Sequence, residues 1–140
     1  MRGEQYALKV PAVMDQLPSV TQFILSYARH TGKLNDKQVH QLDLVTDEIF
    51  SNIVQHGFQS NGSEHVVEVI CELLPDRFQV HFLDDAPAFD PLAVTASQMS
   101  SDDELQVGGW GLQFLLALMD VSEYQHDGQR NRLIVGKKYL

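Results

Sequence analysis

Hydrophobic and polar residues recur with two different periods along the chain, and the periods predict where strands and helices lie. Apolar residues at every second position predict a strand over residues 4–10 with one buried face. Apolar residues at helical spacing predict helices over residues 19–31 and roughly 36–56. Two β-rich runs follow, over residues 66–74 and 77–83, and a short Pro-containing turn between them predicts an antiparallel pair.

The second half of the chain begins with a long segment that fits no periodic element. Residues 86–108 contain two prolines and several serines, and such a segment inside a domain is usually a lid or binding loop. A helix follows the glycine-rich run at 108–111, and residues 121–126 and 131–138 predict a final hairpin around Asp127-Gly128. The whole order predicts an α+β fold: a two-layer sandwich of a mostly antiparallel sheet with helices on one face.

Capping residues predict where the first two helices start and end. Ser19 with Gln22, and Asn35 with Gln38, each have the spacing of a capping box at a helix N-terminus. Gly57 is expected to close the second helix, because glycine is favoured just past a helix C-terminus.

Composition limits the class of protein. The 140 residues, 44% of them hydrophobic, predict one globular domain over residues 1–140. A net charge of −9 argues against direct binding of nucleic acid or of an anionic membrane surface. The single cysteine, Cys71, lies in a strand-like apolar run and suggests a buried thiol. Because no signal peptide or membrane-spanning run is visible, we expect a cytoplasmic protein.

Three polar side chains line one face of the second predicted helix. Glu48, Asn52 and His56 are four residues apart in turn, so they stack along one side of an α-helix. Asparagine is a poor residue for a helix interior, which indicates that its amide has a use. Its carbonyl oxygen suits Mg²⁺, and a carboxylate one turn away is placed to accept a proton from a hydroxyl. The alternative is an ordinary solvated helix face.

Two further runs suggest recognition of a small molecule. Asp84-Asp85 ends a strand and enters a Pro-containing turn, where a carboxylate at the base of a pocket can accept a hydrogen bond from an exocyclic amine. The glycines of Gly108-Gly109-Trp110-Gly111 precede a helix N-terminus, which favours an anion such as phosphate. An acidic turn and a flexible hinge are the alternatives.

Together these features resemble the GHKL ATPase superfamily, and within it the bacterial anti-sigma-factor serine kinases. The resemblance rests on Glu48-x-x-x-Asn52 and on four runs: Asp84–Pro91, Gly108–Leu112, Leu118–Asp120 and Asn131–Val135. It covers nearly the whole chain.

The resemblance implies roles for residues that match the family's motifs. Glu48 matches the catalytic carboxylate, Asn52 the Mg²⁺ ligand and Asp84 the aspartate that reads adenine. The segment at about 92–107 matches the ATP lid. The remaining residues expected to contact the nucleotide flank these positions: His56, Ala86, Ala88, Gly108, Gly109, Trp110, Gly111 and Leu112.

Two departures from the family pattern leave the activity open. The family's Asp-x-Gly-x-Gly has alanines here, Ala86 and Ala88, and no basic residue lies between Ala86 and Gly111. Phosphoryl transfer depends on neutralising developing charge, so binding of nucleotide is better supported than phosphotransfer.

The resemblance implies an anti-sigma factor with protein-serine kinase activity. Using ATP and Mg²⁺, it would phosphorylate an anti-sigma factor antagonist and so become free to hold a sigma factor. Relatives commonly dimerise, so a homodimer is a further expectation. Two alternatives are a kinase-inactive, nucleotide-responsive switch of the same fold and the catalytic domain of a histidine kinase. The latter is disfavoured because no separate helical hairpin presents a phosphoacceptor histidine.

Overall fold

A computed structural model describes residues 3–57, 64–93 and 109–140. The elements in chain order are β1 (Glu4–Pro11), η1 (Met14–Gln16), α1 (Leu17–His30), α2 (Asp36–Asn52), η2 (Ile53–Gly57), β2 (Val66–Leu73), β3 (Arg77–Asp84), η4 (Pro91–Ala93), α4 (Gly109–Ala117), β4 (Val121–His126) and β5 (Asn131–Lys138).

The strands form one five-stranded sheet in the order β1-β2-β3-β5-β4, and every neighbouring pair is antiparallel. The central strand, β3, pairs with β2 on one side and with β5 on the other. In the β3–β5 register, Asp84 stands opposite Asn131, so the end of one strand meets the start of the other. This register determines which polar side chain lies beside the Asp84 carboxylate.

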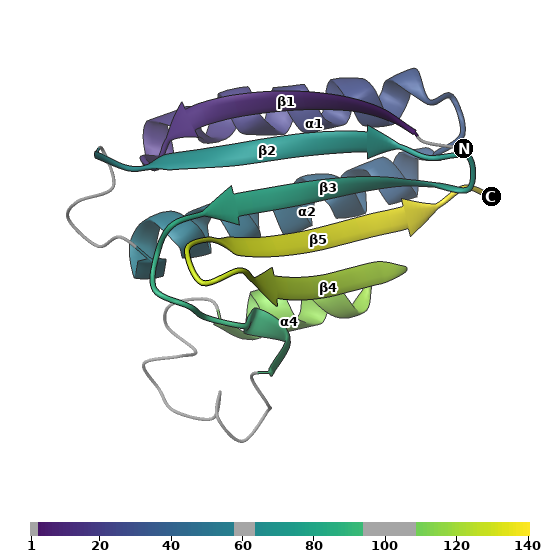
Figure 1. The fold of residues 1–140 in the computed structure, drawn as a ribbon. Coiled ribbons are helices and arrows are strands. Elements are labelled where there is room, and N and C mark those ends of the chain that lie inside the picture. The colour runs from purple at the N-terminus through teal and green to yellow at the C-terminus, as the bar shows by residue number, and fades with distance from the viewer. Residues whose placement is uncertain (1–2, 58–63, 94–108) are drawn as a thin grey trace.

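Helices cover one face of the sheet, as Figure 1 shows, which confirms the predicted two-layer α+β fold. Alternate strand residues point toward the helices and are buried in the core, Val67, Val69, Phe78, Val80, Phe82 and Val135 among them. The matching stripe on α1 and α2 includes Val20, Ile24, Leu42 and Ile49. The inward faces of the strands and of the helices therefore pack together in one apolar layer.

The cap at the start of α2 is confirmed, but the cap predicted for α1 is wrong. The Gln38 amide N–H donates to Asn35 Oδ1 at 2.8 Å, and the Asn35 amide N–H donates to Gln38 Oε1 at 2.9 Å. By contrast, α1 begins at Leu17 with Pro18 in its first turn, ahead of Ser19, and no side chain caps it. Proline starts this helix because its φ is already helical and its missing N–H needs no partner.

The helix predicted over residues 36–56 changes character near its end. The α-helical part stops at Asn52, and Ile53–Gly57 continue it as a π-helix. The four-residue spacing that relates Glu48 to Asn52 in an α-helix therefore does not extend to His56, since a π-helix has more residues per turn. Such π turns are frequent at functional sites.

The sheet face opposite the helices carries a polar network. Glu72 accepts hydrogen bonds from Gln5 at 3.0 Å and from Gln79 at 2.6 Å, and it lies 2.9 Å from His81 Nε2. Arg132 contacts His81 Nδ1 at 2.7 Å. Since arginine can only donate, Nδ1 accepts and Nε2 carries the proton toward Glu72.

In the part of the chain that the structure describes, no helix is both long and apolar enough to cross a membrane.

Candidate functional site

The candidate site lies where the C-terminal end of β3 faces the helix layer. Asp84 is the last residue of β3 and continues the inward-facing series of Phe78, Val80 and Phe82, so its carboxylate points to the helix side of the sheet. Its exposed fraction is only 6%. Asp84 thus places a carboxylate at the edge of the core, where an ionised group is costly unless it is paired or hydrogen-bonded.

Both hydrogen bonds to this carboxylate reach the same oxygen. Oδ1 of Asp84 accepts from the Asn131 side-chain amide at 3.0 Å and from the Ala86 backbone N–H at 3.0 Å. Among the described residues no partner is found for Oδ2. Burial raises the pKa of Asp84, and the bonds from Asn131 and Ala86 partly oppose that rise. The arrangement leaves one acceptor oxygen for a donor on a ligand.

Asn131 is the residue of this site that sequence reasoning left without a role. Its side-chain N–H groups reach Asp84, the Ala86 carbonyl at 3.0 Å and the Pro87 carbonyl at 3.3 Å. Its Oδ1 accepts from the Phe89 amide at 3.2 Å and from the Tyr124 hydroxyl. The sequence marked Asn131 only as the start of a run that resembles the family, and Asp84 stands 47 positions away. In the structure Asn131 is 6% exposed.

The turn after Asp84 accommodates alanine where the family has glycine. Ala86 is buried and belongs to the hydrophobic core, whereas Ala88 is exposed. Asp90 then caps the following turn by accepting from the Leu92 amide at 2.8 Å. Gln113 of α4 donates to the Pro91 carbonyl, which ties α4 to this turn.

The predicted catalytic pair lies on the last turns of α2. Figure 1 shows the C-terminal end of α2 at the same end of the sheet as the end of β3. Glu48 and Asn52 are both partly buried there. Burial raises the pKa of Glu48, and the neighbouring charge of Asp47 adds to the rise. The pKa of Asp47 is itself raised by burial and by Asp43. A carboxylate with a raised pKa is a better proton acceptor, as a general base requires.

The glycine-rich run is only partly described. The helix α4 begins at Gly109, as the motif predicted, and its N-terminus lies at the same end of the sheet as Asp84 (Figure 1). Leu112, the next predicted contact, is buried in the core. Gly108 and the predicted lid from residue 94 onward lie outside the described residues, as do the side chains of His56 and Trp110 and the surroundings of Gly111. Their predicted contacts stay predictions.

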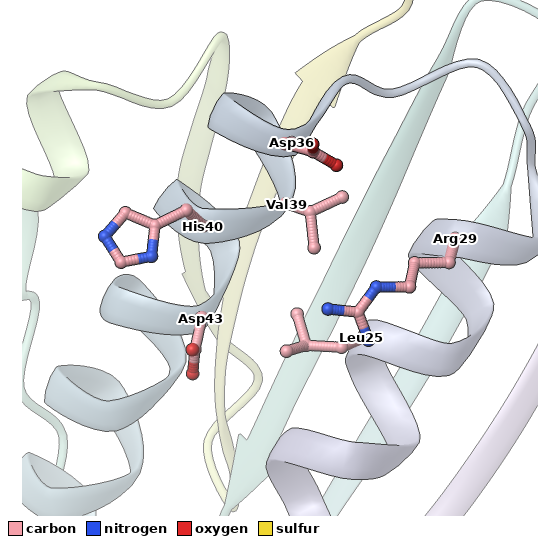
Figure 2. A pocket seen from close by; sticks show the side chains of 6 residues that line it. All are labelled: Leu25, Arg29, Asp36, Val39, His40 and Asp43. Carbon is pink, nitrogen blue, oxygen red and sulfur yellow. The ribbon is translucent and has the colours of Figure 1, made fainter.

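A pocket of about 180 Å³ lies elsewhere, between α1 and α2 (Figure 2). It is lined by two apolar residues, Leu25 and Val39, and by four polar or charged ones, Arg29, Asp36, His40 and Asp43. None of these is a predicted site residue. The nucleotide prediction therefore rests on the chemistry around Asp84 and receives no support from this pocket. Among the described residues, no cluster of His, Cys, Asp or Glu is arranged to hold a metal ion.

Comparison with known proteins agrees with these motifs. The model of the histidine kinase-like ATPase domain family matches residues 10–137. Serine-protein kinase RsbW from Staphylococcus aureus, in strains JH9 and Newman, is 23% identical over 128 residues, which cover 86% of this chain and 79% of the relative. The matches confirm the resemblance predicted from the motifs.

A solved structure has the same fold but a lower sequence identity to this chain. The histidine kinase AdeS of Acinetobacter baumannii superposes with a TM-score of 0.53 at 11% identity, over 99% of this chain and 69% of that one. Identity this low supports the fold alone.

Proposed function

Because this chain belongs to the histidine kinase-like ATPase domain family, we propose that it binds ATP with Mg²⁺ and acts as a protein-serine kinase on a protein partner. The proposal treats residues 1–140 as one catalytic domain. The kinase part takes further support from the similarity to serine-protein kinase RsbW.

The observation that carries the proposal is Oδ2 of Asp84, the carboxylate oxygen that has no partner among the described residues. Because Asn131 and the Ala86 amide both donate to Oδ1, only Oδ2 is left to meet a ligand, and a carboxylate oxygen can only accept. The exocyclic amine of adenine is a donor of the right kind. A purine with a carbonyl at the same position would place an acceptor against the carboxylate, so the site favours adenine over guanine.

Residues of α2 and α4 would bind the phosphate end of the ligand. Asn52 would supply an amide oxygen to Mg²⁺, which prefers oxygen ligands and keeps several waters. The backbone N–H groups at the start of α4 would hold phosphate oxygens. When bound, Mg·ATP supplies the phosphoryl group and the charge neutralisation that the chain itself lacks between Ala86 and Gly111.

Glu48 would act as the general base. Its raised pKa, caused first by burial, suits it to take a proton from a serine hydroxyl presented by the partner. The partner would be an anti-sigma factor antagonist, and its phosphorylation would release this chain to hold a sigma factor. The net charge of −9 is compatible with a partner that presents basic residues.

The nucleotide site is tested by replacing Asp84 with its isosteric amide. In Asp84→Asn, the donors from Asn131 and Ala86 orient the new side-chain oxygen toward themselves, so its NH₂ faces the ligand's amine. Calorimetry with ATP and Mg²⁺ should show affinity lower by about tenfold to a hundredfold, the cost of a charge-assisted hydrogen bond. Asp15→Asn, an exposed change of equal charge, should bind as the wild type does. Equal affinity in all three proteins would exclude Asp84 as the residue that binds the nucleotide.

A second candidate is a nucleotide-responsive binding switch without phosphotransfer. It is favoured by the lack of any basic residue between Ala86 and Gly111. The two candidates separate when the protein is incubated with Mg·ATP and its antagonist and the antagonist is weighed by mass spectrometry. A gain of one phosphoryl group that is lost in Glu48→Gln supports the kinase. No gain with protein proven to bind ATP supports the switch.

A further inference from the structure

The side-chain amide of Asn131 has only one possible orientation. Its nitrogen faces two backbone carbonyls, of Ala86 and Pro87, and carbonyls can only accept. Its oxygen faces the backbone N–H of Phe89, which can only donate. Exchanging the amide's oxygen and nitrogen would place like against like at all three backbone groups. Asn131 therefore always offers an N–H to Asp84.

Tyr124 anchors the other end of the same amide. Its hydroxyl donates to Asn131 Oδ1 from the edge strand β4, whose register places Tyr124 opposite Leu133 of β5. The chain of bonds thus runs from β4 through the start of β5 to the end of β3. Hydrogen bonds linked in this way polarise one another and restrict the geometry of the side chains they join.

We propose that Asn131 is a positioning residue for nucleotide recognition. Its amide holds Oδ1 of Asp84 and thereby presents Oδ2 to the amine of the purine, with Tyr124 holding the amide in place. This inference rests on the proposed function, since it concerns how the carboxylate of the same nucleotide site is oriented. It also explains how the turn keeps its shape with alanine at position 86, because the Asn131 amide binds the carbonyl of that residue.

Two roles for Asn131 predict opposite changes in the pKa of Asp84. If Asn131 positions and stabilises the carboxylate, Asn131→Ala removes a donor while burial persists, and the pKa of Asp84 rises above its wild-type value. If Asn131 only ties down the turn, its loss admits water, and the pKa falls toward the ordinary 3.8. Other groups act on Asp84 equally in both proteins: Asp85 next in the chain raises the pKa, and His126 on β4 lowers it.

The test measures the pKa of Asp84 by carboxyl NMR in the nucleotide-free protein, and then ADP affinity at pH 7 by calorimetry. For Asn131→Ala we expect a higher pKa and affinity weaker by about tenfold or more. The matched control is Asn35→Ala, which removes a capping asparagine far along the chain and should destabilise without changing either readout.

A pKa of Asp84 that falls or stays constant in Asn131→Ala, with wild-type ADP binding intact, overturns the inference and leaves the proposed function standing. Wild-type protein that does not bind ADP refutes the proposed function itself, and the inference with it. If Asn131→Ala does not fold, Tyr124→Phe takes its place in both measurements. We then expect a smaller rise in pKa and a severalfold loss of affinity, and no change in either overturns the inference.

Discussion

Replacing Asp84 by asparagine should stabilise the protein at neutral pH while weakening nucleotide binding. The carboxylate is only 6% exposed, and burial is the largest influence on its raised pKa. A raised folded-state pKa means that the folded chain binds the proton more tightly than the unfolded chain does. At pH values above that pKa, the ionised carboxylate therefore lowers the free energy of unfolding.

The structure indicates the size of the gain. The amide oxygen of Asp84→Asn keeps both bonds to Oδ1, from Asn131 and from the Ala86 N–H, each 3.0 Å in the wild type. No hydrogen bond is lost and a buried charge is removed, as in stabilising changes at functional sites. We expect a gain of roughly 0.5–2 kcal/mol. At about 2–4 °C per kcal/mol for a domain of this size, the melting temperature should rise by about 1–8 °C.

The assay is chemical denaturation of wild type, Asp84→Asn and Asp15→Asn between pH 4 and pH 8. The difference in the free energy of unfolding between Asp84→Asn and wild type should be largest at neutral pH. It should shrink as pH falls through the raised pKa of Asp84 toward the ordinary 3.8, because the wild-type side chain is then also neutral. Asp15→Asn should stay within about 0.5 kcal/mol of wild type. If Asp84→Asn were the less stable protein at pH 7, the carboxylate would be net stabilising and the argument from burial would be wrong.

Three further outcomes are expected. Asn35→Ala should lower stability by about 1 kcal/mol in denaturation, whereas Asn35→Asp should keep the cap and cost a few tenths at most; equal losses would contradict the capping box. Gly136→Ala should cost about 1–3 kcal/mol, because the added Cβ would lie 3.0 Å from the Phe78 carbonyl oxygen; unchanged stability would mean that β3 and β5 separate easily. Phosphotransfer to the antagonist, followed by mass spectrometry, should fall as pH drops through the raised pKa of Glu48; Asp47→Asn should move that decline to lower pH, and an unmoved profile would assign it to another group.

Local chemistry in the sequence was enough to predict most elements and their inner faces. Alternation in residues 4–10 and the Pro75-Asp76 turn matched β1 and the β2–β3 hairpin. Asp127-Gly128 marked the last hairpin, where Gly128 adopts a φ of +94° that other residues avoid. These signals are short-range, since a turn or a cap is made by residues a few positions apart.

Where competing local rules met, the prediction failed. Ser19 and Gln22 had the spacing of a capping box, yet Pro18 already satisfied the helix start, so α1 begins at Leu17. The stripe of α2 continued past Asn52 without showing that the backbone widens into a π-helix there. Periodicity reports which side of an element is buried, but not the small changes in winding that packing imposes.

What the sequence determined by itself was the fold class, the capped start of α2 and the identity of Asp84 as a candidate recognition residue. What only the tertiary structure decided was the partner of that carboxylate. Hydrophobic alternation shows which face of β5 turns inward, but it does not show that β5, rather than β4, lies beside β3. That pairing places Asn131 opposite Asp84 and gives one carboxylate oxygen its partners, while the other has none among the described residues. Contacts between residues far apart in the chain depend on strand order and register, which the packing of the whole domain selects.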